Sequence, residues 1–139
     1  MKVKALEDLQ VWQDSRAFVK SIYELTSLKN FSKDFGLKDQ IQRASVSIRN
    51  NISEGYEHDN NREFLKFLGY SKGSAGEVRS MLYVALDLNY ISNDQFKVSY
   101  DKAVGIITQI SNFKKYLRNY IIKEKIEKVK SFFLMTRNL

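Results

Sequence analysis

The densest group of titratable side chains lies near the middle of the chain and comprises Glu54, Glu57, His58, Asp59 and Glu63. Carboxylates beside an imidazole are residue types that serve general acid–base catalysis and metal binding. A di-iron helical bundle needs paired Glu-x-x-His elements on separate helices, and this chain has one histidine. The commoner explanation is a polar loop between two helices, with acidic residues near the positive end of the following helix. We therefore expect no enzyme and no metal site, and keep catalysis at this loop only as an alternative.

Other catalytic chemistries lack the residues that they require. The chain has no cysteine, which excludes disulfides, thiolate nucleophiles and zinc–thiolate sites within it. No Gly-x-Ser-x-Gly element is present, and His58 has no partner identifiable by spacing. The segment 69–76 (GYSKGSAG) follows no predicted strand and has neither the Rossmann nor the Walker spacing of a phosphate-binding loop. We expect no cofactor, and assembly or binding remains as the class of function.

A second chemically distinctive group is basic and lies near the C-terminus. The net charge is +7, and residues 114–139 hold eight Lys or Arg against two Glu. The candidates for nucleic-acid contact are Lys114, Lys115, Arg118, Lys123, Lys125, Lys128, Lys130 and Arg137, with Tyr116 and Tyr120 interleaved. They predict salt-sensitive, sequence-independent binding of RNA or DNA. The alternatives are a solvated helix face, which is the commoner use of such lysines, and an anionic membrane surface, which Glu124 and Glu127 disfavour.

Four segments carry apolar residues at helical spacing, and none shows the alternation of a strand. The predicted helices cover about 8–29, 37–54, 60–89 and 92–130. Asp8, Asn60 or Asn61, and the Ser92–Gln95 capping box are the expected N-terminal caps, while Gly36 and Gly55 are expected at chain turns. The absence of proline is compatible with long uninterrupted helices. Short connections predict an all-α, antiparallel up-down-up-down four-helix bundle.

The fourth helix is predicted to be much longer than the others and to overhang the bundle. We therefore divide the chain into a bundle, residues 1–122, and a basic C-terminal extension, residues 123–139. Ile122, Ile126, Val129 and Phe133 continue an apolar line along this extension at spacings of four, three and four. Such a line suits packing against another subunit or a partner helix. We therefore predict an oligomer.

Other packing candidates lie on the second and third helices. Gly69, Gly73 and Gly76 share one helix face, which favours a groove where a neighbouring backbone or bulky side chain packs closely, in this chain or in another. Asn51 and Glu54, like Ser74 and Glu77, are candidates for hydrogen bonds that fix helix register.

Several segments, in order, resemble a known family. They are residues 8–13 (DLQVWQ), 36–37 (GL), 40–48 (QIQRASVSI), 51–55 (NISEG), 63–68 (EFLKFL) and 73–77 (GSAGE). This pattern, over about Leu6 to Leu117, is similar to the four-helix-bundle proteins encoded in bacterial 23S rRNA intervening sequences. The resemblance implies a cytosolic homopentamer without established catalytic activity. The related accessory variability determinants of diversity-generating retroelements share the pentameric bundle and bind nucleic acid and a reverse transcriptase through basic surface.

Two positions depart from the common pattern of this family. Ser32 stands where the first interhelical loop often has proline, and residues 56–59 (YEHD) follow Gly55 where a basic residue is often found. The acidic loop weakens any expectation that nucleic acid binds there. The expected partners are other copies of the chain, in a ring-like homopentamer, and RNA, DNA or a nucleic-acid-processing protein. Residues 1–8 contain no signal-peptide run and no segment approaches a membrane span, so a cytoplasmic location without membrane contact is expected.

Overall fold

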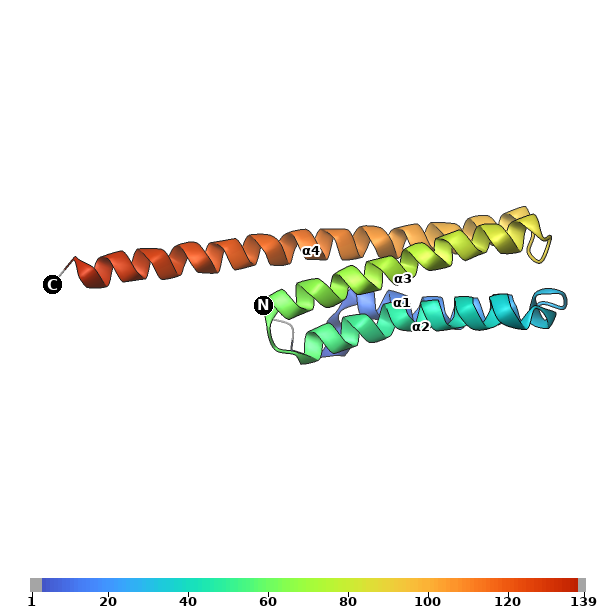
Figure 1. Cartoon of the computed structure of the whole chain (residues 1–139), viewed down its shortest axis with the longest axis horizontal. Helices are drawn as coiled ribbons and strands as arrows, with labels where there is room; N and C mark the ends of the chain where they lie inside the picture. Colours follow the sequence, from blue (N-terminus) through green and yellow to red (C-terminus); the bar gives the residue numbers. More distant parts are fainter. Residues whose placement is uncertain (1–3, 138–139) are drawn as a thin grey trace.

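The computed structural model describes residues 4–137 and has four α-helices in that range. They are α1 (Gln10–Thr26), α2 (Phe35–Glu57), α3 (Asn61–Asp87) and α4 (Asn93–Thr136), with 3₁₀ turns at Leu6–Asp8 and Phe31–Lys33. Successive helices run in opposite directions (Figure 1), and no strand occurs among the described residues. The all-α four-helix arrangement is therefore confirmed. Residues 1–3 and 138–139, which the predicted bundle and extension include, lie outside the described residues.

Two of the predicted N-terminal caps are confirmed. The Asn60 side chain accepts hydrogen bonds from the backbone N–H groups of Arg62 and Glu63 at the start of α3. Ser92 and Gln95 form the reciprocal capping box at the start of α4. Each cap satisfies backbone donors that have no partner within the first helical turn.

Three predictions about the helix ends are wrong. Asp8 belongs to a 3₁₀ turn, and Leu9, whose side chain makes no capping bond, precedes α1. Gly36 lies inside α2, which Asp34 caps by accepting a hydrogen bond from the Leu37 N–H. Gly55 also lies inside α2, because this helix continues to Glu57.

Non-glycine residues make the left-handed turns between the helices. Asp59 has φ 50° and Asn89 has φ 59°. Both residue types tolerate this region better than most, because their short polar side chains bond locally. The chain therefore reverses direction after α2 and after α3 without glycine at these positions.

The core contains apolar side chains from all four helices, and the largest fully buried ones include Phe18, Ile48, Leu68, Leu82 and Leu117. Small residues let α2 and α3 approach closely. A Cβ added to Gly55 would lie 2.8 Å from the Phe67 Cβ and 2.9 Å from the Phe64 Cδ1. The buried Ser71 hydroxyl donates to the Ile48 carbonyl across the same contact, at 2.7 Å. Gly55 and Ser71 thus fix the distance between these two helices.

Helix α4 projects well past the other three helices (Figure 1). It has 44 residues and is therefore about 66 Å long. Leu117 is its last buried residue, and every described residue from Ile122 onward is exposed. We call residues 122–137 the overhang; its helix ends at Thr136, six residues beyond the predicted end. None of the described helices combines the length and apolar character required to span a membrane.

Candidate functional site

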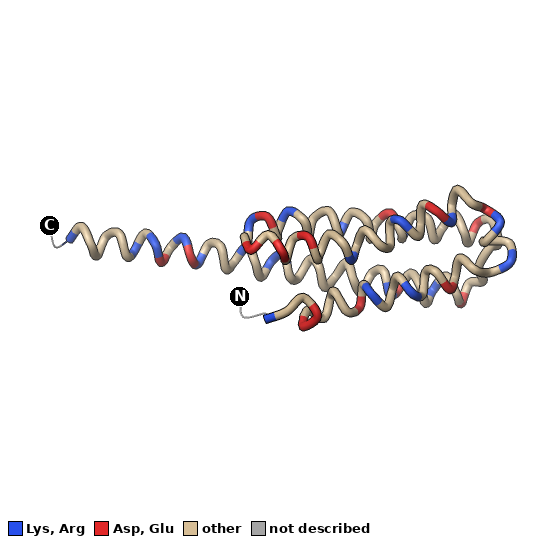
Figure 2. Tube along the Cα trace, turned by 90° about the horizontal axis from the view of Figure 1, so that it is seen from below, with Lys and Arg blue, Asp and Glu red and all other residues tan. Residues whose placement is uncertain are grey.

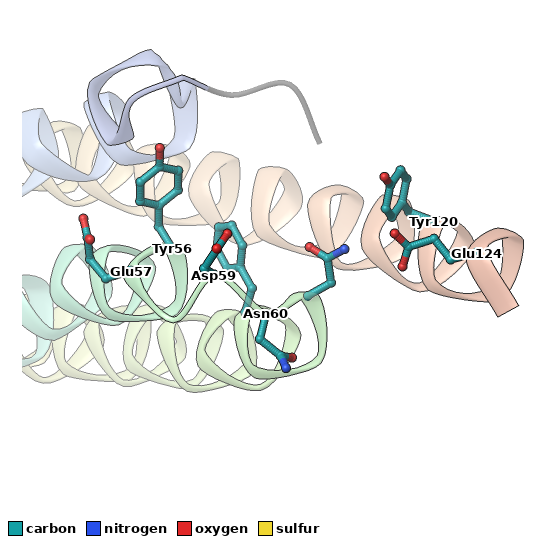
Figure 3. A pocket seen from close by; sticks show the side chains of 8 residues that line it. Tyr56, Glu57, Asp59, Asn60, Tyr120 and Glu124 are labelled. Carbon is teal, nitrogen blue, oxygen red and sulfur yellow. The ribbon is translucent and has the colours of Figure 1, made fainter. Parts of the chain in front are cut away.

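A polar pocket lies where the overhang begins, beside the turn between α2 and α3 (Figure 3). It has a volume of about 400 Å³ and is lined by Tyr56, Glu57, Asp59, Asn60, Asn61, Phe64, Tyr120 and Glu124. Three carboxylates line it, and no lysine or arginine does. This arrangement disfavours a bound phosphate group, because like charges repel at short range.

The structure brings together only part of the predicted acidic cluster. Glu57 and Asp59 line the pocket, whereas Glu54 and Glu63 do not. His58 stacks on Phe67 with ring centroids 5.0 Å apart. Glu124 joins the pocket from α4, which spacing along the chain could not indicate. No group of acidic, histidine or cysteine residues suited to a metal ion occurs within residues 4–137.

The predicted basic residues separate into two places. Lys114 and Arg118 lie on the part of α4 that packs in the bundle, together with Lys72 of α3, and we call these three the basic cluster. Burial, followed by the charges of Arg118 and Lys72, lowers the pKa of Lys114 below its ordinary value. Among the described residues, no carboxylate forms an ion pair with any of the three.

The Lys114 ammonium group lies beside Gly69. A Cβ at Gly69 would lie 3.4 Å from the Lys114 Nζ, which is an ordinary van der Waals distance, so this contact does not require glycine. Sequence reasoning selected Lys114 and Arg118 but missed Lys72. This lysine lies on α3, three residues after Gly69, whereas Lys114 and Arg118 lie on α4.

The remaining basic candidates do not belong to this cluster. Lys115 is exposed on α4, and Lys123, Lys125, Lys128 and Lys130 are exposed on the overhang. Figure 2 shows that the charges of the overhang are mixed, because Glu124 and Glu127 lie among the lysines. The overhang also exposes apolar side chains: the exposed fraction is 56% for Ile122, 49% for Ile126, 50% for Val129 and 65% for Phe133.

Close packing at the glycine face of α3 was predicted either within this chain or against another subunit. The structure does not show the first of these for Gly73 and Gly76. Gly73 and Gly76 are exposed, and a Cβ at either position would meet nothing within 4 Å. Close packing of these two glycines inside the bundle is therefore wrong, because α2 and α4 contact other faces of α3. Contact between these glycines and another subunit stays a prediction.

The two register candidates on α2 differ. The Asn51 side chain donates to the Ser47 carbonyl and hydroxyl at 2.8 and 3.0 Å, and the Ser74 hydroxyl of α3 donates to the same Ser47 hydroxyl at 2.9 Å. Asn51 therefore belongs to a network that joins α2 to α3. Glu54 is exposed, and its side chain has no hydrogen bond or ion pair in the described part of the chain, so it does not fix register there.

An open groove follows the contact between α1 and α4. Two hollows of about 320 and 390 Å³ lie along it and share Lys102. Ala17, Phe18, Gly105 and Ile106 line the first, and Leu25, Leu28 and Val98 line the second. The Gln109 amide donates to the Asp14 carboxylate at 2.8 Å and links the two helices. Sequence reasoning missed this α1–α4 groove, although Gly105 interrupts a helical run of larger residues.

Comparison with known proteins identifies relatives by fold and by sequence pattern. A crystal structure of a protein of unknown function from the S23 ribosomal protein family of Bacteroides thetaiotaomicron matches with a TM-score of 0.71 and 24% identity. The match covers 76% of this chain and 95% of that one. No match is found among curated proteins. Residues 7–112 match the family described as 23S rRNA-intervening sequence protein. The chain therefore belongs to the 23S rRNA-intervening sequence protein family.

Proposed function

We propose that the protein is a cytoplasmic, non-enzymatic assembly module whose copies associate into a ring of five. The α1–α4 groove is the observation that carries this proposal. Phe18 and Ile106 form a buried apolar base, and Ala17 and Gly105 present almost no side chain above it. Small residues allow the backbone of another helix to approach closely, and apolar surface removed from water favours association.

The geometry of Gly105 supports this use of the groove. A Cβ at Gly105 would meet nothing within 4 Å, so no neighbour in the described chain requires glycine there. Glycine in a helix interior costs roughly 1 kcal/mol relative to alanine. Contact with a second copy explains why a helix of 44 residues contains it.

The molar mass in solution tests the proposal. Light scattering after size exclusion, at micromolar concentration, should give about five times the mass of one chain. Gly105→Lys places a charged side chain in the groove and should lower the mass. Thr108→Lys adds the same charge at an exposed position one turn away, outside the residues lining the groove, and should leave the mass unchanged. A monomeric wild-type protein would overturn the proposal, and an unchanged mass for Gly105→Lys would exclude the groove as the interface.

The basic cluster favours a second candidate function, nonspecific binding of RNA or DNA. Lys72, Lys114 and Arg118 combine positive charge from two helices, and Tyr116 is half exposed nearby in the sequence. Lysine and arginine contacts to phosphates release counterions, so such binding weakens steeply with salt. A nucleic-acid-processing partner would then be recruited through the bound strand.

Titration of labelled RNA and DNA at two salt concentrations tests this second function. The full chain, a chain ending at residue 122, and a Lys114→Gln/Arg118→Gln variant separate the basic cluster from the overhang. Loss of salt-sensitive binding only in the double variant supports the cluster, whereas loss only in the shortened chain assigns binding to the overhang lysines. Absent binding by all three proteins rejects the function.

A further inference from the structure

Four apolar residues of the overhang lie on a different side of α4 from the residues that face the bundle, whereas the exposed Phe132, Leu134 and Met135, near the end of the helix, lie at least about 60° outside that group. Successive residues of an α-helix are turned by about 100° about its axis. On that scale, the buried residues Ile106, Ile110 and Leu117 fall within an arc of about 40°. The four exposed residues Ile122, Ile126, Val129 and Phe133 fall within an arc of about 60°, centred about 150° away from the first. We call these four residues the apolar seam.

No part of the described chain can cover the seam. Its residues lie beyond the last buried position of α4, and on the same angular scale they point away from the side of α4 that packs in the bundle. The exposed fraction of each of the four residues lies between 49% and 65%. Any surface that covers the seam therefore comes from outside residues 4–137.

Lysines flank the seam on both sides. On the same angular scale, Lys125 lies about 40° from one edge of the seam, and Lys130 lies about 40° from the other. Lys123 lies next to Lys130 on the second flank. The two acidic residues of the overhang, Glu124 and Glu127, lie on the opposite side of the helix, at least about 100° from the nearest edge. The charge next to the seam is therefore positive on both sides.

The spacing and width of the seam favour a helical partner. Spacings of four, three and four are those of the a and d positions of a coiled coil. Within residues 122–131 the apolar residues all belong to the seam, and such a narrow apolar arc is typical of a coiled-coil contact. A helix that lies on a membrane surface presents a broader apolar face. The seam, from Ile122 to Phe133, extends over about 17 Å, or two layers of a and d residues.

The flanking lysines disfavour a second copy of the same segment. In a parallel pair, Lys125 of one helix would face Lys130 of the other, at the positions that normally hold opposite charges. In an antiparallel pair, positions on the same flank face each other, so Lys123 and Lys130 again meet lysine or Arg137, and Lys125 meets Lys125 or Phe132 of the other copy. A partner with Glu or Asp at these positions would turn both repulsions into attractions.

We propose that the overhang is a docking helix for an acidic amphipathic helix of a partner protein, which places apolar residues at a and d positions on the seam and carboxylates beside Lys125 and Lys130. The proposal concerns residues outside the α1–α4 groove and does not depend on five-fold assembly. Where several overhangs belong to one oligomer, a partner with several such helices gains avidity.

Fluorescence anisotropy with labelled synthetic helices tests the proposal on the full chain. The probe is a three-heptad peptide with Leu at a and d and Glu at e and g. One control peptide has Lys at e and g, and a second has the acidic composition in scrambled order. The acidic peptide should bind at least about tenfold more tightly than either control. Equal binding of the acidic and basic peptides, or of the acidic and scrambled peptides, would overturn the proposal.

Charge reversal provides a sharper test, with a matched control on the same helix. Lys125→Glu should weaken binding of the acidic peptide about tenfold and strengthen that of the basic peptide. Lys128→Glu makes the same charge change about 100° from the nearest edge of the seam. It should change the affinity for the acidic peptide and for the basic peptide only slightly. Equal effects of the two substitutions would show that only net charge matters and would refute the docking geometry.

Two further measurements separate the other occupants of the seam. Val129→Asp should abolish peptide binding without lowering the thermal midpoint, because Val129 packs against nothing in the bundle. If Val129→Asp instead lowers the molar mass of the protein alone, the seam joins copies of the chain. If the wild-type overhang binds phosphatidylserine vesicles or RNA while the acidic peptide does not bind, the occupant is a membrane or a nucleic acid. Either result would reject the proposal.

Discussion

Substitution of Gly55 by alanine should destabilise the protein, although alanine is the better helix former. The added Cβ would lie 2.8 Å from the Phe67 Cβ, 2.9 Å from the Phe64 Cδ1 and 3.3 Å from the Phe64 Cα. The last atom belongs to the backbone, so α3 must move away from α2 to make room. Overpacking of this kind costs about 1–3 kcal/mol, whereas the gain in helix propensity is at most about 1 kcal/mol. The expected net loss in the free energy of unfolding is therefore about 0–2 kcal/mol, with a central value of about 1 kcal/mol.

Gly73→Ala is the matched control, because Gly73 also lies inside a helix but has open space around it. Nothing lies within 4 Å of a Cβ at this position. Only the propensity term remains, and it should raise the free energy of unfolding by about 0.5–1 kcal/mol. The same chemical change should therefore shift stability in opposite directions at the two sites, by about 2 kcal/mol in total, or roughly 8 °C between the thermal midpoints.

Urea and thermal unfolding followed by circular dichroism measure both variants. All proteins must be compared at one protomer concentration, because association changes apparent stability. The reasoning about α2–α3 packing is refuted if Gly55→Ala is as stable as the wild type or more stable. If Gly73→Ala lowers stability, and the loss grows with protein concentration, Gly73 contacts another subunit rather than solvent.

Three smaller predictions concern a helix cap and two titratable groups. Asn60→Ala should lower the free energy of unfolding by about 1 kcal/mol and Asn60→Gly by only a few tenths in urea titration, because Asn60 bonds two N–H groups of α3. The pKa of Tyr90 is raised above 10.0 because its hydroxyl donates to Asp34. The wild type should therefore be more stable than Tyr90→Phe below pH 10.0, and this difference should disappear as the pH rises through the raised pKa. A difference in the free energy of unfolding that persists in alkaline unfolding curves would contradict this. The pKa of Lys114 is lowered, so at pH values below that pKa the charged side chain disfavours folding. Lys114→Gln should therefore stabilise the protein at neutral pH. This gain should vanish as the pH rises to 10.5, where the lysine is losing its charge in the unfolded chain as well. Arg118→Gln should raise the pKa of Lys114 in an NMR titration, and an unchanged pKa would contradict the repulsion.

The fold could be predicted from sequence to the extent that helical periodicity carries it. Apolar spacing gave four helices, and local capping chemistry placed the starts of α3 and α4 at Asn60 and Ser92. The glycines were less informative. Gly36 and Gly55 were expected at chain turns, whereas both lie inside α2, and at Gly55 the side chains of Phe64 and Phe67 of α3 leave no room for a Cβ. Close approach between helices depends on tertiary packing, which local sequence does not specify.

The candidate sites could be predicted less well, because they combine residues from distant segments. Glu124 lines the pocket beside Glu57, and Lys72 joins Lys114, although each pair is separated by more than 40 positions. Periodicity indicated that Ile122, Ile126, Val129 and Phe133 share one helix face, and α4 is helical through all four residues. It did not show that α1 and α4 leave a groove, because that depends on how far apart the two helices lie.

The continuity of α4 also makes the overhang a lever arm. The last 15 residues of the helix span about 22 Å beyond the bundle, with no hinge, proline or glycine between them and the core. A tilt of about 5° at Leu117 would therefore move the far end by about 2.5 Å. The direction that the distal surface of the overhang faces depends on the number of residues between it and the bundle. One residue inserted near Asn119 would turn that surface by about 100° about the helix axis, whereas seven inserted residues would nearly restore its original direction. Insertions and deletions can thus change the direction that the distal surface of the overhang faces, in steps of about 100°, while the bundle keeps its structure.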